Sequence, residues 1–330
     1  MSKRNGLFYF LIGFVLNLYN SKIKRMRPVF TNANLETEFQ REGYVKVPFL
    51  SADEVEQLTN AYFDSLSQSG GLITAEDKDL KDMITYDFTF IDKNIDYKRK
   101  VFEIITSVFE KHYHKYLKGY KPIIANFIRK KTETGEVPLH QNWAFVDERK
   151  CTSVSIWCPL VDGTVENGTL QVIPGTHKRC GEIRGPMIPW ELNGIKHQII
   201  DNDLIPLETK AGDAVILDDS IVHYSAINHT DNLRLAIQLI LIPEEEQSIH
   251  YHVDPAKNQN KVEVLAVDKE FYMEFNPWEK AGNSKKVNEF KYKPFDMSYP
   301  EFKQTIFGPR FDEELKAPTG IIQRIKSIFS

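Results

Sequence analysis

Three side chains stand at spacings that suit a metal site. His140 and Asn142 lie two residues apart, and His223 lies much further along the chain. Because residues i and i+2 of an extended strand point to the same side, His140 and Asn142 are predicted to present two ligands from one strand, with His223 on a facing strand. Two neutral imidazoles and an oxygen ligand on one side of a metal leave positions open for a chelating co-substrate and oxygen, as in non-haem iron(II) oxygenases. We therefore predict His140, Asn142 and His223 as metal ligands, with no further catalytic side chain.

An arginine follows at a spacing that suits the co-substrate. Arg234 comes eleven residues after His223, about one hairpin further on. A guanidinium there can form a bidentate bond with the far carboxylate of 2-oxoglutarate. Each of these residues alone has an ordinary structural explanation, such as a buried histidine or a buried ion pair. It is their order and spacing together that favour an oxygenase site.

Longer stretches around these residues resemble the phytanoyl-CoA dioxygenase family. The resemblance runs from about Phe39 to Ile242, roughly three fifths of the chain. It is carried by residues 138–143 (PLHQNW), 146–148 (VDE), 155–160 (SIWCPL), 166–170 (ENGTL), 172–178 (VIPGTHK) and 211–213 (AGD), the last of which leads to His223.

The resemblance implies an iron(II)- and 2-oxoglutarate-dependent dioxygenase that uses O2 to hydroxylate a C–H bond of a small organic or lipid-like substrate. His140 and His223 match the family's iron-binding histidines. Arg234 and Ser225 match the groups that hold 2-oxoglutarate, and Trp157 lies close to the family's tryptophan beside that co-substrate. His177 is interpreted as a structural turn residue.

Asn142 departs from the family's H-x-D motif, because a carboxamide stands where the carboxylate is expected. An amide oxygen can bind a metal but brings no negative charge. Three explanations stay open: a working enzyme with a weaker metal site, a ligand-binding protein that has lost catalysis, or a deliberate inactivating change. A cupin-type zinc hydrolase or isomerase is a further alternative, although it gives Arg234 no clear task. If Asn142 is not a ligand, Asp147 and Glu148 are the first replacements to consider.

The elements that position these residues are predicted to be helices first and short strands later. Ser51 to Glu54 forms a capping box that opens a helix through about Leu66, and apolar spacing predicts another helix over 101–117. His250 and His252 are expected to be a surface or loop pair. Short strands separated by turns predict a mostly β (α+β) fold, a double-stranded β-helix or cupin-like jelly roll with flanking N-terminal helices. The predicted strands cover 43–48, 123–131, 152–160, 168–173, 214–217, 221–227 and 233–242.

The chain divides into a single oxygenase domain over 29–310 and two terminal segments. Residues 1–28 form an apolar run with basic flanks, too short to span a bilayer. That segment either docks on the protein body or lies in a membrane interface. Residues 311–330 form an amphipathic tail, for which packing on the core is the more common outcome.

Composition excludes some classes of protein. The formal net charge of −4 and the pI near 6.2 lack the basic excess of a nucleic-acid-binding protein. Three cysteines without regular spacing suit reduced thiols in the cytoplasm, with membrane association through the N-terminal segment left open.

Overall fold

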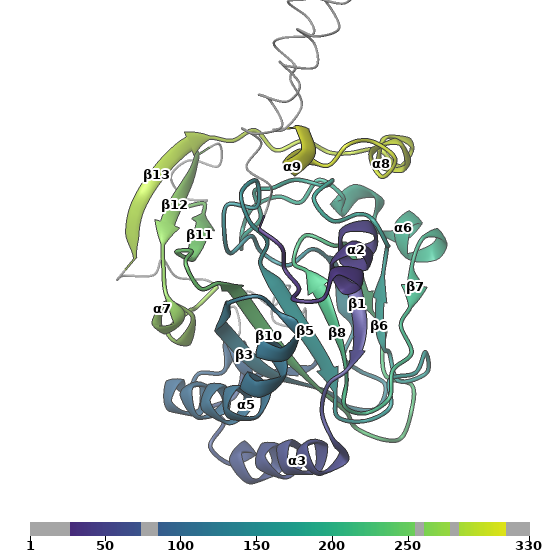
Figure 1. Cartoon of the computed structure of the whole chain (residues 1–330), viewed down its shortest axis with the longest axis vertical. Helices are drawn as coiled ribbons and strands as arrows, with labels where there is room; N and C mark the ends of the chain where they lie inside the picture. The colour runs from purple at the N-terminus through teal and green to yellow at the C-terminus, as the bar shows by residue number, and fades with distance from the viewer. Residues whose placement is uncertain (1–26, 74–84, 255–260, 278–283, 315–330) are drawn as a thin grey trace, which may run out of the picture.

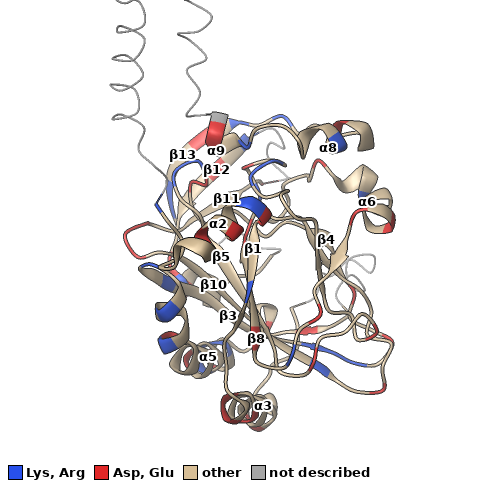
Figure 2. Cartoon of the chain, turned by 45° about the vertical axis from the view of Figure 1, so that its right-hand side comes forward, with Lys and Arg blue, Asp and Glu red and all other residues tan. Residues whose placement is uncertain are grey.

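The protein is built around two antiparallel sheets. The computed structural model describes residues 27–73, 85–254, 261–277 and 284–314, so the predictions for 1–26 and 315–330 lie outside the described residues. Most charged residues lie on the helices and loops outside the sheets (Figure 2). Within the described ranges, no helix is both long enough and apolar enough to cross a membrane.

The larger sheet has six strands in the order β1-β8-β5-β10-β3-β2, and every neighbouring pair is antiparallel (Figure 1). Its longest pairing joins β10 to β3, with Arg234 opposite Lys130 at one end and Pro243 opposite Tyr120 at the other. The strands are β1 (Tyr44–Pro48), β2 (Asp87–Phe88), β3 (Tyr120–Lys130), β5 (Val154–Pro159), β8 (Asp213–Asp218) and β10 (Arg234–Pro243).

The smaller sheet has four strands in the order β4-β9-β6-β7. They are β4 (Val137–His140), β6 (Leu170–Val172), β7 (Ile205–Pro206) and β9 (His223–Ser225). Residues of both sheets line one shared cavity, so the sheets enclose it between them. This is the double-stranded β-helix, or jelly roll, that the sequence predicts.

The central strands β5 and β10 of the larger sheet are buried on both faces. In β5, Val154, Ile156 and Cys158 join the core between sheet and helices, while Ser155 and Trp157 take the alternate positions toward the sheet-enclosed interior. In β10 the same alternation directs Leu235, Ile237 and Leu239 outward to the helices, and Arg234 and Gln238 inward to the cavity. The period of two residues along a strand therefore decides which side chains reach the site.

Three N-terminal helices cover the outer face of the larger sheet, and they are α2 (Ala33–Glu42), α3 (Ala52–Leu66) and α5 (Ile95–Tyr116). The capping box of Ser51 and Glu54 at the start of α3 is present as predicted. Helix α5 begins six residues before the predicted start at residue 101, because the Asn94 side chain accepts hydrogen bonds from the amides of Asp96 and Tyr97 and so caps an earlier first turn.

A third sheet follows the jelly roll and was not predicted. Strands β11 (Ile249–His252), β12 (Lys261–Ala266) and β13 (Lys285–Lys291) pair antiparallel in that order. The expectation of a surface or loop pair at His250 and His252 is wrong, because both lie on β11 and His250 is 3% exposed. The remaining elements are η1 (Thr89–Ile91), η2 (Asn193–Ile195), α6 (Lys196–Asn202), α7 (Lys269–Met273), α8 (Tyr299–Thr305) and α9 (Phe311–Glu314).

Candidate functional site

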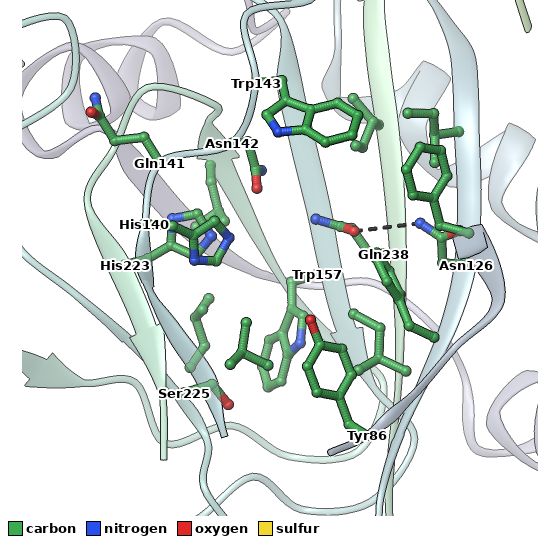
Figure 3. Close-up of a pocket in the computed structure, with 18 of the residues that line it drawn as sticks. Tyr86, Asn126, His140, Gln141, Asn142, Trp143, Trp157, His223, Ser225 and Gln238 are labelled. Atoms are coloured by element: carbon green, nitrogen blue, oxygen red, sulfur yellow. Dashed lines mark hydrogen bonds between the residues drawn. The ribbon is translucent and has the colours of Figure 1, made fainter. Parts of the chain in front are cut away.

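A cavity of about 360 Å³ lies between the two sheets and contains all six predicted site residues on its wall. Most of the lining is apolar, and Arg234 is the single permanently charged side chain among the described residues that form it. Figure 3 shows the two histidines on one side of the cavity and the amides of Asn126 and Gln238 on the other.

His140 and His223 stand directly opposite each other on the paired strands β4 and β9. They therefore lie on neighbouring strands of one sheet and not on facing strands. Their ring centroids are 4.1 Å apart. Nδ1 of His140 lies 2.7 Å from the carbonyl of Pro138, and Nδ1 of His223 lies 2.9 Å from the carbonyl of Ile221. Because a carbonyl only accepts hydrogen bonds, each Nδ1 carries the proton and each Nε2 keeps its lone pair.

Both imidazoles are held in the neutral form that binds metals. Burial lowers the pKa of His140, against hydrogen bonds with the Pro138 carbonyl and the Asn142 side chain that raise it. Burial also holds the pKa of His223 well below its ordinary value, and the neighbouring His140 lowers it further. Two neutral rings with free Nε2 atoms on one wall suit a divalent cation of borderline softness.

Asn142 lies beyond the end of β4, so the expectation that it shares one strand with His140 is wrong. Its side chain is held by the amide nitrogen. Nδ2 donates to the hydroxyl of Ser155 at 3.0 Å and to Oδ1 of Asp219 at 2.8 Å. Because the Ser155 hydroxyl donates its single hydrogen to Oδ1 of Asp219, it can only accept from Asn142, which fixes the orientation of the amide. Oδ1 of Asn142 is therefore left facing the cavity, on the side of the two imidazoles (Figure 3).

Neither of the two replacement ligands proposed from the sequence lines the cavity. Glu148 is buried in a bidentate ion pair with Arg184, at 2.7 and 2.8 Å, and Asp147 is half-exposed and pairs with Lys150. No group of three or more His, Cys, Asp or Glu side chains that could hold a metal occurs in the described part of the chain.

The sequence analysis missed Asp219, a carboxylate that lies immediately behind Asn142. Asp219 follows β8 and is 0% exposed. Its Oδ1 accepts from Ser155 at 2.6 Å as well as from Asn142. Burial raises the pKa of Asp219 to about 7, against hydrogen bonds from Ser155, Ser153 and Asn142 that lower it. The pair Asp218–Asp219 in the sequence was the available signal, but nothing in the local pattern indicates which of the two turns toward Asn142.

Arg234 and Ser225 meet at the other polar end of the cavity. Nη2 of Arg234 donates to the Ser225 hydroxyl at 2.7 Å and to the Gly168 carbonyl at 2.8 Å. Its Nε and Nη1 are buried without a hydrogen-bond partner in the structure, and Arg234 makes no ion pair with any described carboxylate. Burial lowers the pKa of Arg234 to about 10, so it stays charged at neutral pH. Two buried guanidinium nitrogens without an acceptor suit an anionic ligand.

Lys130 and Gly168 hold this cluster in place. Nζ of Lys130 contacts the Ser225 hydroxyl and the Ala226 carbonyl, both at 2.5 Å. Burial and the neighbouring Arg234 lower the pKa of Lys130 to about 5, which leaves Arg234 as the cation of the cluster. Gly168 has φ +68°, and a Cβ there would lie 2.0 Å from the Ala226 carbonyl oxygen. Only glycine therefore fits at the carbonyl that receives Arg234.

Trp157 lies beside Arg234, whose guanidinium carbon is 5.5 Å from the centroid of a Trp157 ring. This contact and the place of Trp157 on the cavity wall agree with the position inferred from the sequence. His177 lies away from the cavity, where Nε2 is 3.2 Å from the Gln40 carbonyl and 2.6 Å from Nη1 of Arg310. That environment agrees with a structural role.

An aromatic cluster, with Phe90 and Trp143 on the cavity wall, lies on the far side of the cavity from Ser225 (Figure 3). We call this side the outer end and the side with Arg234 and Ser225 the inner end. Phe90 stacks on Phe275 with centroids 5.3 Å apart, and Trp143 meets Phe275 edge-on at 5.1 Å. Across the cavity from the histidines, Nδ2 of Asn126 donates to Oε1 of Gln238 at 3.4 Å (Figure 3). The Gln238 Nε2 then points toward the histidine side (Figure 3).

Comparison with known proteins supports the sequence resemblance. The model of the family described as phytanoyl-CoA dioxygenase matches residues 39–236. The chain belongs to this family. A phytanoyl-CoA dioxygenase domain-containing protein 1 homolog of Dictyostelium discoideum is 33% identical over 165 residues, which are 48% of this chain and 56% of that protein. Phytanoyl-CoA dioxygenase 1 of Oryza sativa is 36% identical over 117 residues, 34% of this chain and 40% of that protein.

These alignments thus span about half or less of each curated relative. A similar solved structure is the non-haem α-ketoglutarate-dependent carbocyclase SnoK from nogalamycin biosynthesis. It matches with a TM-score of 0.50 and 17% identity over 66% of this chain and 86% of that one. At this identity the likeness supports the jelly-roll fold alone.

Proposed function

We propose that this member of the phytanoyl-CoA dioxygenase family is an iron(II)- and 2-oxoglutarate-dependent dioxygenase that hydroxylates a C–H bond of a small apolar or lipid-like molecule. The observation that carries the proposal is that one cavity holds both a pair of imidazoles with unprotonated Nε2 atoms and a buried guanidinium with two nitrogens lacking acceptors. A metal that is bound by imidazoles can meet a dicarboxylate that is bound by a guanidinium only if both groups line the same cavity.

The metal would be held by Nε2 of His140, Nε2 of His223 and Oδ1 of Asn142. When bound, iron(II) and 2-oxoglutarate together supply the O2 chemistry, in which the co-substrate is decarboxylated to succinate. The backbone carbonyls of Pro138 and Ile221 fix both histidine tautomers before a metal arrives. Asp219 and Ser155 fix the amide of Asn142 in the same way.

The far carboxylate of 2-oxoglutarate would be held by Arg234 and Ser225. Because Gly168 and Ser225 already occupy Nη2, Nε and Nη1 are the donors left for the carboxylate. Trp157 covers one side of the guanidinium and keeps water from it. Removing water strengthens a charge-assisted hydrogen bond.

The substrate would bind against the aromatic cluster. Beyond Arg234, the described lining of the cavity carries no permanent charge, so a phosphate or carboxylate of the substrate has no counter-ion inside once 2-oxoglutarate is bound. The reacting part of the substrate is therefore apolar. Gln238 Nε2, which points toward the histidine side (Figure 3), is an amide donor that could orient a single polar group of the substrate.

The experiment that tests this proposal is an anaerobic titration of the full chain with Fe²⁺ and 2-oxoglutarate, in which chelation gives a weak visible charge-transfer band. We expect the band with the unaltered chain and its loss in His223→Ala. Admitting O2 should then release succinate. Absence of the band at saturating concentrations of both ligands would exclude the oxygenase.

A ligand-binding protein without turnover is the second candidate, and Asn142 is the observation that favours it. The neutral amide weakens the metal site, while the Arg234 cluster stays complete. The same titration separates the two candidates, because a binding protein gives the band but releases no succinate.

A further inference from the structure

A buried carboxylate without a counter-ion lies behind the proposed metal site. Asp219 is completely buried and forms no ion pair with any described cation. The nearby Arg184 is already committed to both oxygens of Glu148. The adjacent Asp218 differs, because its Oδ2 lies 3.9 Å from Nζ of Lys178. A buried charge is costly unless an opposite charge lies near it.

The contacts of Asp219 connect it to the cavity through a single side chain. Its Oδ1 takes a hydrogen bond from Nδ2 of Asn142 at 2.8 Å, and the amide presents its opposite end, Oδ1, to the cavity. A hydrogen bond from an amide nitrogen to an anion increases the negative charge on the amide oxygen, because the amide is polarised along its length. The carboxyl group that Asn142 lacks thus stands one side chain further back.

We propose that Asp219 is the displaced carboxylate of the metal site: it orients and polarises Asn142 as a metal ligand and supplies the negative charge that the H-x-N sequence has lost. This inference rests on the proposed function, because it requires a divalent cation at His140 and His223. Asp219 acts through Asn142 and is a positioning residue. Hydrogen-bonded partners behind metal ligands affect metal affinity by about 10–100-fold.

This arrangement changes the metal affinity that we expect when a carboxylate is restored at position 142. Asn142→Asp by itself places a second carboxylate against Asp219, buried and at hydrogen-bond distance. Two like charges in contact oppose each other, so the single variant cannot gain the full benefit of an anionic ligand. Exchanging the two residues, as Asn142→Asp with Asp219→Asn, keeps one carboxylate and one amide in contact and moves the charge onto the metal.

The test is Mn²⁺ binding to the full apo chain, followed by the loss of the free Mn²⁺ signal in electron paramagnetic resonance, which needs no turnover. We expect Asp219→Asn to weaken Mn²⁺ binding by about 10–100-fold. The exchange variant should bind at least as tightly as the unaltered chain, and more tightly than Asn142→Asp. Asp218→Asn is the matched control, since it removes a buried neighbouring charge that does not touch Asn142, and it should bind Mn²⁺ as the unaltered chain does.

Thermal unfolding of each variant separates a structural role from the proposed one. If Asp219→Asn lowers the melting temperature but binds Mn²⁺ like the unaltered chain, Asp219 only supports the fold and the inference is overturned. The inference also fails if the exchange variant binds no more tightly than Asp219→Asn. If neither the unaltered chain nor the exchange variant binds Mn²⁺, the histidine pair is not a metal site and the proposed function falls with the inference.

Discussion

The inner end of the cavity carries a charged side chain, whereas the outer end is apolar. At the inner end, Arg234 lines the cavity with two guanidinium nitrogens that lack acceptors, and its buried surroundings keep water from them. At the outer end, Phe90, Trp143 and Phe275 contact one another, and even the histidine behind them, His250, is held neutral because burial lowers its pKa to about 3. One end therefore suits an anion and the other excludes charge, which under the proposed function would separate a dicarboxylate from an apolar substrate.

The largest effect should come from removing the inner cation. Arg234→Ala deletes the charged donors available to a carboxylate, and each such hydrogen bond contributes about 1.5–3 kcal/mol. We expect 2-oxoglutarate to bind about 1000-fold more weakly, measured by calorimetry with Mn²⁺ in place of iron. Arg129→Ala is the control, because Arg129 on the same sheet pairs with Asp87 and does not line the cavity. Unchanged binding in Arg234→Ala would remove the basis for calling this end an anion site.

A change at the outer end should affect stability and leave the inner end alone. Phe275→Ala removes a ring that packs against Phe90 and Trp143, and truncating a buried phenylalanine costs about 3 kcal/mol or more. Denaturant unfolding should show this loss, while the affinity for 2-oxoglutarate stays that of the unaltered chain. Phe63→Ala is the control, because Phe63 is 48% exposed. A weaker affinity in Phe275→Ala would mean that the two ends are not independent.

The neutral histidine of the outer end gives a pH dependence. Above pH 6.5, His250 is neutral in both the folded and the unfolded chain. As the pH falls below 6.5, His250 binds a proton in the unfolded chain but stays neutral in the folded chain until about pH 3. The free energy of unfolding therefore decreases over this window. Each pH unit is worth about 1.4 kcal/mol, which gives a loss of about 2 kcal/mol at pH 5.

The measurement compares the free energy of unfolding at pH 7.5 and pH 5 for the unaltered chain and for His250→Phe. The variant should lose about 2 kcal/mol less between the two values. Other buried histidines such as His177 contribute equally to both proteins and cancel in the difference. Equal losses would show that His250 accepts a proton in the folded state and that the outer end tolerates charge.

Much of the candidate site could be predicted from sequence. The two-residue period of β10 directs Arg234 inward, chain spacing indicated His140 and His223, and the family resemblance indicated Ser225; all four line the same cavity. The described strands of the two sheets were predicted within a few residues for the same reason, except β2, β4 and β7, for which no range was predicted. Periodicity is a property of a short segment and needs no knowledge of what it packs against.

The features that sequence analysis missed depend on contacts between distant segments. Asp219 meets Asn142 across 77 positions of the chain, and no period links them. His250 appeared polar and exposed because β11 pairs with β12, whose sequence gave no clear strand pattern. The early start of α5 depends on one capping side chain, Asn94, within a stretch of mixed polarity.

The smallest effect should separate the contribution of the Ser225 hydroxyl from that of the Arg234 guanidinium. Ser225→Ala removes a hydroxyl that accepts from Nη2 of Arg234 at 2.7 Å and donates to the Gly168 carbonyl at 2.7 Å. The guanidinium keeps its own hydrogen bond to Gly168, so it stays in place and retains its charge. We expect 2-oxoglutarate to bind about 10-fold more weakly, since one hydrogen bond to a charged group is worth about 1.5 kcal/mol, while Mn²⁺ affinity is unchanged. Ser225→Thr keeps the hydroxyl and should recover most of the affinity. A loss in Ser225→Ala as large as in Arg234→Ala would mean that the serine hydroxyl, and not the Gly168 carbonyl, holds the guanidinium toward the cavity, whereas no loss would leave Arg234 as the whole of the anion site.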